Sequence, residues 1–317
     1  MKQLKAMNAV YSYYFPEVRK LIDDLIKDYP HEIFLTSSNV NLDQFHEPVL
    51  EKLLKFYAGA VPDLKNFRFA YPTSGSSEGI REYLTLLQSR GVNQIYVLKG
   101  EYEGFKETAK TRNIAAVEID LEKTSPSKLE KGLWFISNPS ARDGNIIPNE
   151  TIMDICESGH RIFYDMAYVG STTQYKFDVN HKNIEAAVIS LSKPFGLFRY
   201  RVGFTFSRND VPSLYSNKWF KSIPALLIAE KIFDNMEVDE LYAKYRPVQK
   251  KIIEEINDEF KLAIQPSDAI LLGYLPKDDA AKLDKSLQEL IAPFERGDNY
   301  RFCLTPYYEQ KEKEKPK

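Results

Sequence analysis

Between residues 71 and 207, short apolar segments alternate with longer segments in which apolar positions recur with a helical period. Most of the short segments are apolar at nearly every position, which is typical of strands that helices cover on both faces. The candidate strands are residues 95–98, 115–119, 133–136, 161–164, 187–191 and 202–206. The candidate helices are residues 77–89, 103–112 and 149–158. This alternation predicts an α/β/α domain of three layers with a mainly parallel sheet.

The pattern changes after Pro212, where a long helical region runs to residue 260 with an expected break near Pro247. Shorter elements follow at residues 269–274, 278–291 and 300–304. They predict a smaller α+β domain at the C-terminal end of the chain.

The predicted division of the chain has four parts. A large domain covers residues 46–210 and a small domain covers residues 211–308. Residues 1–45 are expected to pack with the small domain. Residues 309–317 carry alternating charges and almost no apolar side chain, so a disordered tail is expected there.

Composition excludes several classes of function. With 317 residues, 43% of them hydrophobic, the chain can bury a large core. Its 43 Lys and Arg nearly balance its 45 Asp and Glu, so neither nucleic acid nor an anionic membrane is an expected partner. The two cysteines, Cys156 and Cys303, have no neighbours at metal-ligand spacing, and no metal is expected. No apolar segment is long enough for a signal peptide or a membrane span, so a cytoplasmic location is expected.

The strongest chemical signal is the run S-L-S-K-P-F-G-L-F-R-Y-R-V-G over residues 190–203. Lys193 follows an apolar strand, at the edge of the sheet where α/β proteins bind ligands. An amine in that position condenses with an aldehyde once burial and nearby cations lower its pKa. Ser190, Ser192 and Arg201 offer hydroxyls and a planar guanidinium, which suit a phosphate dianion.

This run resembles the Schiff-base lysine region of the fold type I pyridoxal-phosphate (PLP) enzymes, and especially the S-x-S-K-x-F-G-L-x-x-x-R-V-G run of the aspartate aminotransferases. The resemblance implies that Lys193 holds PLP as a Schiff base and that Ser190 and Arg201 contact the cofactor phosphate. The alternative is a surface loop with an ordinary lysine and a salt-bridging arginine. Further matching segments, in the family's order, extend the resemblance over roughly residues 50–305.

A second segment, T-S-G-S-S-E-G-I over residues 73–80, is predicted to open a helix. Gly75 permits a tight turn, while Ser76 and Ser77 place amide and hydroxyl donors at the helix N-terminus, which is an anion site. The segment resembles the family's G-x-x-E-x-(I/L) phosphate cup. Because Ser-rich caps precede many helices, an ordinary helix cap is an equal alternative.

A third segment is Gly100-Glu101-Tyr102-Glu103-Gly104-Phe105. Family members usually show P-x-Y or P-x-W here, with the aromatic ring stacked on the pyridine, so the resemblance implies that Tyr102 stacks on PLP. Gly100 stands where the family has proline. Phe105 is therefore an alternative stacking residue, and packing in the core is an alternative for either ring.

The segment S-N-P-S-A-R-D-G over residues 137–144 resembles the family's N-P-x-x-P-x-G loop. The resemblance implies that Asn138 bonds the phenolic oxygen of PLP and approaches the substrate carboxylate. Arg142 replaces the second proline. This replacement is either neutral or adds a cation near the substrate, and we favour the neutral interpretation.

Asp165 and Tyr168 belong to a D-x-A-Y segment that follows an apolar strand. A carboxylate beside the pyridine nitrogen keeps that nitrogen protonated, and the charged ring then withdraws electrons from the substrate Cα. The resemblance assigns this role to Asp165 and a hydrogen bond to the phenolic oxygen to Tyr168. Alternatively, Asp165 is only a helix cap or a turn residue.

Arg301 lies in Asn299-Tyr300-Arg301-Phe302-Cys303, which resembles the C-terminal strand that carries the arginine for the substrate α-carboxylate. A bidentate pair between guanidinium and carboxylate would hold an amino acid in a fixed orientation. A salt bridge at the strand edge is the alternative role.

The chain is thus identified as a member of the fold type I PLP aminotransferases, the class I/II superfamily that includes the aspartate aminotransferases. The resemblance implies transfer of an amino group between an amino acid and a 2-oxo acid, with Lys193, Asp165 and Tyr168 as catalytic residues. Decarboxylation and elimination begin from the same cofactor state and stay alternatives, as does a less favoured non-catalytic regulatory protein. A homodimer is expected from the family, with Tyr57 as the candidate for a phosphate contact from the partner subunit. The sequence identifies neither the amino donor nor the acceptor.

Overall fold

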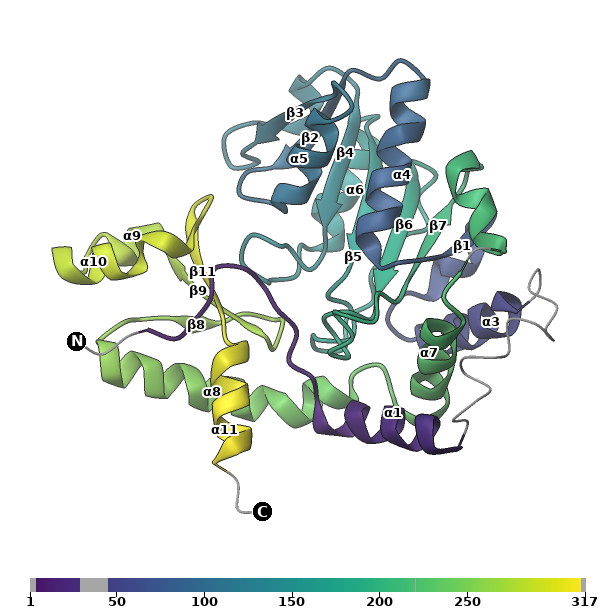
Figure 1. Ribbon diagram of the computed structural model, residues 1–317. Helices are drawn as coiled ribbons and strands as arrows, with labels where there is room; N and C mark the ends of the chain where they lie inside the picture. The colour runs from purple at the N-terminus through teal and green to yellow at the C-terminus, as the bar shows by residue number, and fades with distance from the viewer. Residues whose placement is uncertain (1–3, 29–44, 220, 315–317) are drawn as a thin grey trace.

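The computed structural model describes residues 4–28, 45–219 and 221–314, which form two sheets and the helices around them (Figure 1). The larger sheet has seven strands in the order β1-β7-β6-β5-β4-β2-β3. Its strands are β1 (Phe69–Thr73), β2 (Gln94–Leu98), β3 (Ala115–Ile119), β4 (Leu133–Ser137), β5 (Arg161–Met166), β6 (Ile184–Ser190) and β7 (Gly203–Ser207). The helices of this part are α3 (His46–Phe56), α4 (Ser76–Ser89), α5 (Glu103–Lys110) and α6 (Asn149–Glu157), with the short 3-10 helices η2 (Pro62–Asn66) and η3 (Pro126–Lys128).

The larger sheet is mainly parallel, as the sequence predicts. Strands β3, β2, β4, β5 and β6 pair in parallel, while β7 runs antiparallel between β6 and β1. Every residue of β4 and of β7 is buried. Because β1 runs parallel to β6, the carboxyl ends of six strands meet at one edge, and the segments that follow them lie close together there.

Two layers of apolar side chains explain why these strands are apolar at nearly every position. Phe135 of β4 packs in a cluster with residues of α4 and α5, such as Leu84 and Phe105. Its neighbour Trp134 faces the other side of the sheet, in a cluster that contains Ile152 of α6. Successive strand residues point to opposite faces, so a sheet covered on both sides needs an unbroken apolar run.

The C-terminal part contains an antiparallel sheet of four strands in the order β10-β11-β9-β8. Its strands are β8 (Gln265–Pro266), β9 (Leu272–Pro276), β10 (Glu295–Arg296) and β11 (Asn299–Cys303). The helices are η4 (Pro212–Lys218), α7 (Ile223–Asn235), α8 (Glu240–Phe260), α9 (Lys277–Ala280), α10 (Lys285–Ile291), η5 (Ala292–Phe294) and α11 (Thr305–Lys313). None of the described helices is long and apolar enough to cross a membrane.

Two helix predictions for this part need correction. The helical region after Pro212 is interrupted between α7 and α8, and Pro247 lies inside α8 rather than at a break. Buried side chains on both sides of Pro247, among them Tyr245 and Gln249, hold the helix together although one backbone hydrogen bond is lost. The predicted helix at residues 278–291 is two helices, because the Asp284 carboxylate accepts a hydrogen bond from the Leu287 amide at 3.0 Å and starts a new one.

The tail prediction is wrong for residues 309–313, which belong to α11. The Tyr308 hydroxyl donates to the backbone oxygen of Ile270 at 2.6 Å, and Tyr13 donates to the Glu312 carboxylate at 2.8 Å. The charged C-terminal segment is therefore held by contacts with distant segments. Its local composition does not predict these contacts. Residues 315–317 lie outside the described residues, and the domain boundaries stay predictions.

The N-terminal segment connects the two sheets. Met7 and Cys303 of β11 exchange backbone hydrogen bonds of 3.1 and 2.9 Å. Farther along, the Ser12 hydroxyl donates to the backbone oxygen of Ser192, just after β6. The helix α1 (Pro16–Asp28) follows, and Figure 1 shows the purple segment passing the small sheet on its way to this helix. Residues 29–44 of the predicted N-terminal part lie outside the described residues.

Candidate active site

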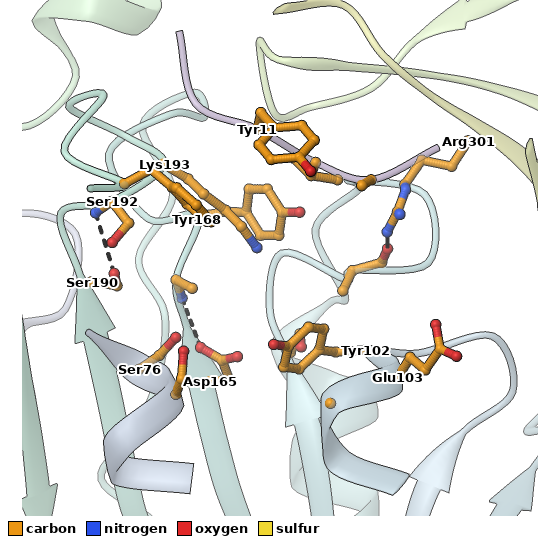
Figure 2. A pocket seen from close by; sticks show the side chains of 18 of the residues that line it. Tyr11, Ser76, Tyr102, Glu103, Asp165, Tyr168, Ser190, Ser192, Lys193 and Arg301 are labelled. Carbon is orange, nitrogen blue, oxygen red and sulfur yellow. Dashed lines mark hydrogen bonds between the residues drawn. The ribbon is translucent and has the colours of Figure 1, made fainter. Parts of the chain in front are cut away.

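A cavity of about 390 Å³ opens at the carboxyl edge of the large sheet. Loops that follow the strands form one wall, while the N-terminal segment and strands β10 and β11 form the other (Figure 2). All the predicted site residues line this cavity except Gly75 and Asn138. The structure thus brings together side chains that are far apart in the sequence.

Lys193 enters the cavity from the loop after β6. Its side chain is partly buried, and its Nζ lies 3.9 Å from the centroid of the Tyr168 ring and 5.9 Å from that of Tyr102. The following residues Pro194 and Phe195 are buried and fix the loop. Aromatic faces thus hold the amine inside the cavity (Figure 2).

Asp165 lies in β5, near the end of the strand, and is 4% exposed. Burial raises the pKa of Asp165 to about 6, although the charge of Lys193 and a 3.0 Å hydrogen bond from the Ala167 amide act in the opposite direction. No ion pair joins its carboxylate to a cation of the described residues. A buried carboxyl group without an ion-pair partner is expected to bind a ligand that places a cationic or N–H group beside it.

The N-terminus of α4 and Arg201 form an anion site. Arg201 Nη2 donates to the backbone oxygen of Ser74 and to the hydroxyl of Ser77, both at 3.0 Å. The cavity wall here also contains Ser76, Ser190 and Ser192. Amide and hydroxyl donors beside a guanidinium suit a phosphate group.

Gly75 does not line the cavity, but it determines how closely Arg201 approaches α4. It has φ +77°, and a Cβ on it would lie 2.6 Å from Nη2 of Arg201. The absence of a side chain therefore lets the guanidinium approach the helix N-terminus.

Of the two candidate stacking residues, Tyr102 is the one at the cavity. Phe105 is fully buried and packs edge-on at 5.4 Å against both Tyr102 and Phe135. Tyr102 lines the cavity and is 37% exposed. The core alternative therefore applies to Phe105, and the Tyr102 ring is free to contact a ligand.

The structure also explains why Gly100 stands where the family has proline. Gly100 has φ +78°, which proline cannot adopt. A Cβ on it would lie 2.6 Å from the backbone nitrogen of Gly297, in the turn between β10 and β11. The close approach of this turn requires glycine.

The structure does not place Asn138 where the resemblance implies. Its Nδ2 donates to the backbone oxygen of Ile147 at 2.8 Å and to the Tyr164 hydroxyl at 2.6 Å, while its Oδ1 accepts from the Ile147 amide at 2.9 Å. The side chain is fully buried, and Ala141 lines the cavity instead. Asn138 therefore stabilises its own loop in this structure, and its contact with the cofactor stays a prediction.

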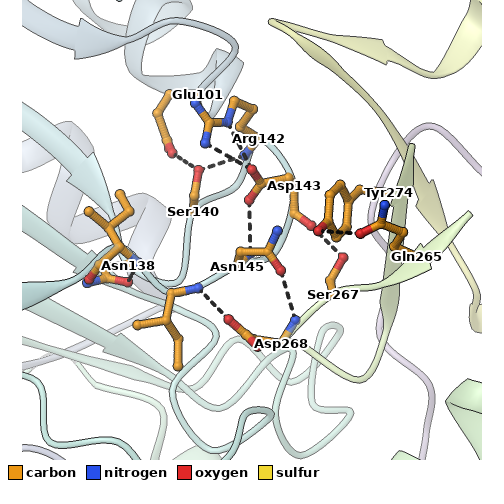
Figure 3. A network of polar contacts seen from close by, with 12 residues as sticks. Glu101, Asn138, Ser140, Arg142, Asp143, Asn145, Gln265, Ser267, Asp268 and Tyr274 are labelled. Carbon is orange, nitrogen blue, oxygen red and sulfur yellow. Dashed lines mark hydrogen bonds and ion pairs between the residues drawn. The ribbon is translucent and has the colours of Figure 1, made fainter. Parts of the chain in front are cut away.

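Arg142 is paired within the same loop. Its guanidinium lies 2.9 Å from the carboxylate of Asp143, which also accepts from the Asn145 amide at 2.9 Å. Figure 3 shows this network, in which Asp268 accepts from the Ile146 amide at 2.9 Å. The contacts tie the loop after β4 to the small sheet. They agree with the neutral interpretation of Arg142.

Arg301 extends from β11 into the cavity and is 4% exposed. Its guanidinium donates to the backbone oxygens of Ala141 and Asn8, the latter at 2.7 Å, and its Nε has no partner among the described residues. Burial lowers the pKa of Arg301. It forms no ion pair with any carboxylate that the structure describes, so the salt-bridge alternative is not observed. The cavity therefore contains a buried cation suited to an anionic ligand.

Sequence reasoning missed part of the cavity. The N-terminal segment contributes Tyr11, whose ring packs edge-on at 5.8 Å against Phe198. Glu103 and Arg296 also line the cavity. Glu103 directly follows Tyr102, whereas the places of Tyr11 and Arg296 depend on packing between distant segments, for which the sequence has no local signal.

Tyr57, the predicted contact from a partner subunit, is fully buried. It packs against Phe56 and Phe233. In this conformation it cannot reach a neighbouring subunit, so the prediction is not supported.

Residues 13–229 match the sequence model of the family described as aminotransferase class I and II. The comparison with curated proteins finds no match. Among solved structures, the fold resembles a histidinol-phosphate aminotransferase from Sinorhizobium meliloti in complex with PLP, with a TM-score of 0.69 and 16% identity over 93% of this chain and 84% of the other. A probable N-succinyldiaminopimelate aminotransferase from Thermus thermophilus gives 0.67 and 16% over 95% and 89%. A PLP-bound C-S lyase from Staphylococcus hominis gives 0.68 and 12% over 98% and 88%.

Proposed function

Because the chain belongs to the class I and II aminotransferase family, whose cofactor is PLP, we propose that it moves an amino group between an amino acid and a 2-oxo acid, with Lys193 as the residue that binds the cofactor aldehyde. The observation that carries this proposal is one cavity lined by a lysine amine, a buried carboxyl group, an anion site and a buried arginine.

The groups around the cavity fit PLP at each of its polar positions. Asp165 supplies a buried carboxyl group for the pyridine nitrogen, and Arg201 with the α4 N-terminus supplies donors for the phosphate. The buried Tyr168 hydroxyl has no partner among the described residues, which suits the phenolic oxygen. Tyr102 offers an aromatic ring for stacking. When bound, the cofactor withdraws electrons from the substrate Cα.

Three side chains of the cavity have separate roles in the proposed reaction. Arg301 binds the substrate α-carboxylate and fixes the orientation of the Cα–H bond. With substrate bound, the Lys193 amine would take the Cα proton as general base and, as general acid, would deliver it to the carbon of the former cofactor aldehyde and not back to Cα. The face of the Tyr168 ring, 3.9 Å away, stabilises the charged form of the amine after it has taken the proton.

Elimination is the second candidate reaction, because the fold likeness to the C-S lyase covers nearly the whole chain. Both reactions begin with removal of the Cα proton, so the cofactor residues do not separate them. Both reactions give a 2-oxo acid, and they differ in the fate of the nitrogen: transfer would pass it to the acceptor 2-oxo acid, whereas elimination of a thiol would release it as ammonia.

A single-turnover assay tests the proposal. PLP-loaded protein is mixed with a panel of amino acids, and 2-oxo acid and ammonia are both quantified. We expect one 2-oxo acid per cofactor without ammonia, and renewed turnover once a 2-oxo acid acceptor is added. Release of ammonia in each turnover would contradict transfer and establish elimination.

The proposal includes a homodimer. Tyr11 and Phe198 line the cavity, and both are exposed, as is the nearby Tyr200 in the same loop as Phe198. Aromatic residues are enriched at protein interfaces. Sedimentation equilibrium tests this part, and a monomer at micromolar concentration would contradict it. A cytoplasmic location stays a prediction.

A further inference from the structure

A second arginine, Arg296, lines the same cavity as Arg301 and has no part in the proposed transfer of the amino group. It ends β10 and pairs through its backbone with Asn299 of β11. Its Nη2 lies 3.6 Å from the carboxylate of Glu103, in the first turn of α5. The side chain of Arg296 is 23% exposed, whereas that of Glu103 is 63% exposed.

The backbone that carries Arg296 is held firmly in place. Gly297, the next residue, packs against the backbone of Gly100. The Asp298 carboxylate accepts a hydrogen bond from the Lys99 ammonium at 2.6 Å. The turn between β10 and β11 is thus fastened to the loop after β2, so the guanidinium emerges from a fixed position.

The pair between Arg296 and Glu103 is weak by comparison. A separation of 3.6 Å exceeds that of a good charge-assisted hydrogen bond. The Glu103 carboxylate is exposed, and water screens its charge, so the pair adds little to the stability of the folded state. Arg296 can therefore bind a ligand carboxylate inside the cavity more strongly than it binds the exposed carboxylate of Glu103.

The charges in this part of the cavity do not balance. Arg301 and Arg296 line the same cavity. Burial lowers the pKa of the Arg301 guanidinium, and the charge of Arg296 lowers it further. Among the described residues, Glu103 is the one carboxylate paired with either arginine. When the α-carboxylate of an amino acid neutralises Arg301, Arg296 is left for a second anion.

We propose that Arg296 binds a distal carboxylate, and that the substrates are dicarboxylic amino acids and 2-oxo acids. The inference rests on the proposed function, since it assigns the substrate of the same cavity. A cationic substrate bound by Glu103 is disfavoured, because Arg296 is the less exposed and more firmly held member of the pair.

Two acceptors of equal length test the inference: 2-oxoglutarate, which has a distal carboxylate, and 2-oxopentanoate, which has none. We expect the wild type to prefer the dicarboxylate. In R296Q, the ratio of the two kcat/KM values should fall about 10- to 100-fold, as expected for loss of a charged hydrogen bond. R296K should recover part of the ratio, because it keeps the charge.

The matched control is K106Q. Lys106 also lies in α5, but its ammonium pairs with the Glu118 carboxylate at 3.0 Å and does not line the cavity. Its substitution should leave the ratio within about twofold of wild type. An unchanged ratio in R296Q, or a wild type without preference for the dicarboxylate, would overturn the inference. So would a diamino acid whose turnover falls in E103Q but not in R296Q.

A binding measurement separates this inference from the proposed function. Calorimetry with PLP-loaded protein compares glutarate with pentanoate, neither of which can exchange an amino group. Glutarate that binds more tightly, and loses this advantage in R296Q, supports the inference even if no amino acid is turned over. Equal binding of the two acids overturns it even if amino transfer is observed.

Discussion

The Nζ atom of Lys193 lies 3.9 Å from the centroid of the Tyr168 ring, while the hydroxyl of the same tyrosine has no hydrogen-bond partner in the described part of the chain. The ring and the hydroxyl of Tyr168 therefore have separate roles. The ring contacts the lysine amine, and the hydroxyl is available to a ligand in the cavity.

Replacing Tyr168 with phenylalanine should separate these roles. The unfolding free energy of the cofactor-free protein should change by less than about 1 kcal/mol, because no protein hydrogen bond is lost, while the affinity for PLP should fall about tenfold. Chemical denaturation and a PLP titration measure the two quantities. Tyr164→Phe is the control, since its hydroxyl accepts from Asn138 at 2.6 Å and its loss should mainly reduce stability. Unchanged PLP affinity in the Tyr168 variant would contradict the assignment.

Asp165 gives the cofactor-free protein a defined pH dependence. Burial raises its pKa from the ordinary value of 3.8 to about 6, so between these values the folded state holds a proton that the unfolded chain has lost. Stability attributable to this group therefore falls as the pH rises through this window. Relative to wild type, cofactor-free Asp165→Asn should gain up to about 3 kcal/mol at about pH 7.5 and almost nothing at about pH 4.

Urea denaturation across this pH range measures the Asp165 effect. The same variant should bind PLP more weakly, because the partner of the pyridine nitrogen is lost. A difference in stability that does not change with pH would show that the Asp165 carboxyl group is not desolvated.

Asn138 should matter for folding rather than for binding. Asn138→Ala leaves the backbone groups of Ile147 without their side-chain partners, which should cost about 2–4 kcal/mol of unfolding free energy. The affinity for PLP should stay within about threefold of wild type, because the side chain does not line the cavity. Denaturation and PLP titration distinguish the outcomes. A stable variant with weak PLP binding would favour the role that the family resemblance implies.

Gly100 should be intolerant of any side chain. Gly100→Ala forces a residue with a Cβ into φ +78° and against Gly297, at a cost of about 1–3 kcal/mol. The control is Gly59→Ala, since a Cβ there meets no atom within 4 Å, and its effect should be within about 0.5 kcal/mol. Urea denaturation of both variants measures the difference. Equal stabilities would contradict the close approach of the two loops.

The parts of the fold that the sequence predicts are those set by local burial. Strand β4 is apolar throughout because both of its faces are covered, and the pattern shows this directly. The pattern does not predict strand β1, because Pro72 interrupts it. This is an edge strand, where a missing amide donor is tolerated.

Part of the candidate site is likewise predictable from local sequence, and part of it depends on packing between distant segments. Lys193 and Asp165 belong to segments that end at the carboxyl edge of the sheet, so their convergence follows from the parallel topology. Tyr11 and Arg296 reach the cavity through packing between the N-terminal segment, the small sheet and the large sheet. The direction of Asn138 depends on the path of its loop, which the matching residue types do not determine.

The most direct test of the account is to locate the covalent attachment of the cofactor. Protein purified with PLP is reduced with borohydride, digested, and analysed by mass spectrometry together with a Lys193→Ala variant. The account predicts a pyridoxyl-phosphate adduct on the peptide that contains Lys193, and neither an adduct nor a borohydride-sensitive visible band in the variant. An adduct on another lysine, or none in the wild type, would contradict the central claim.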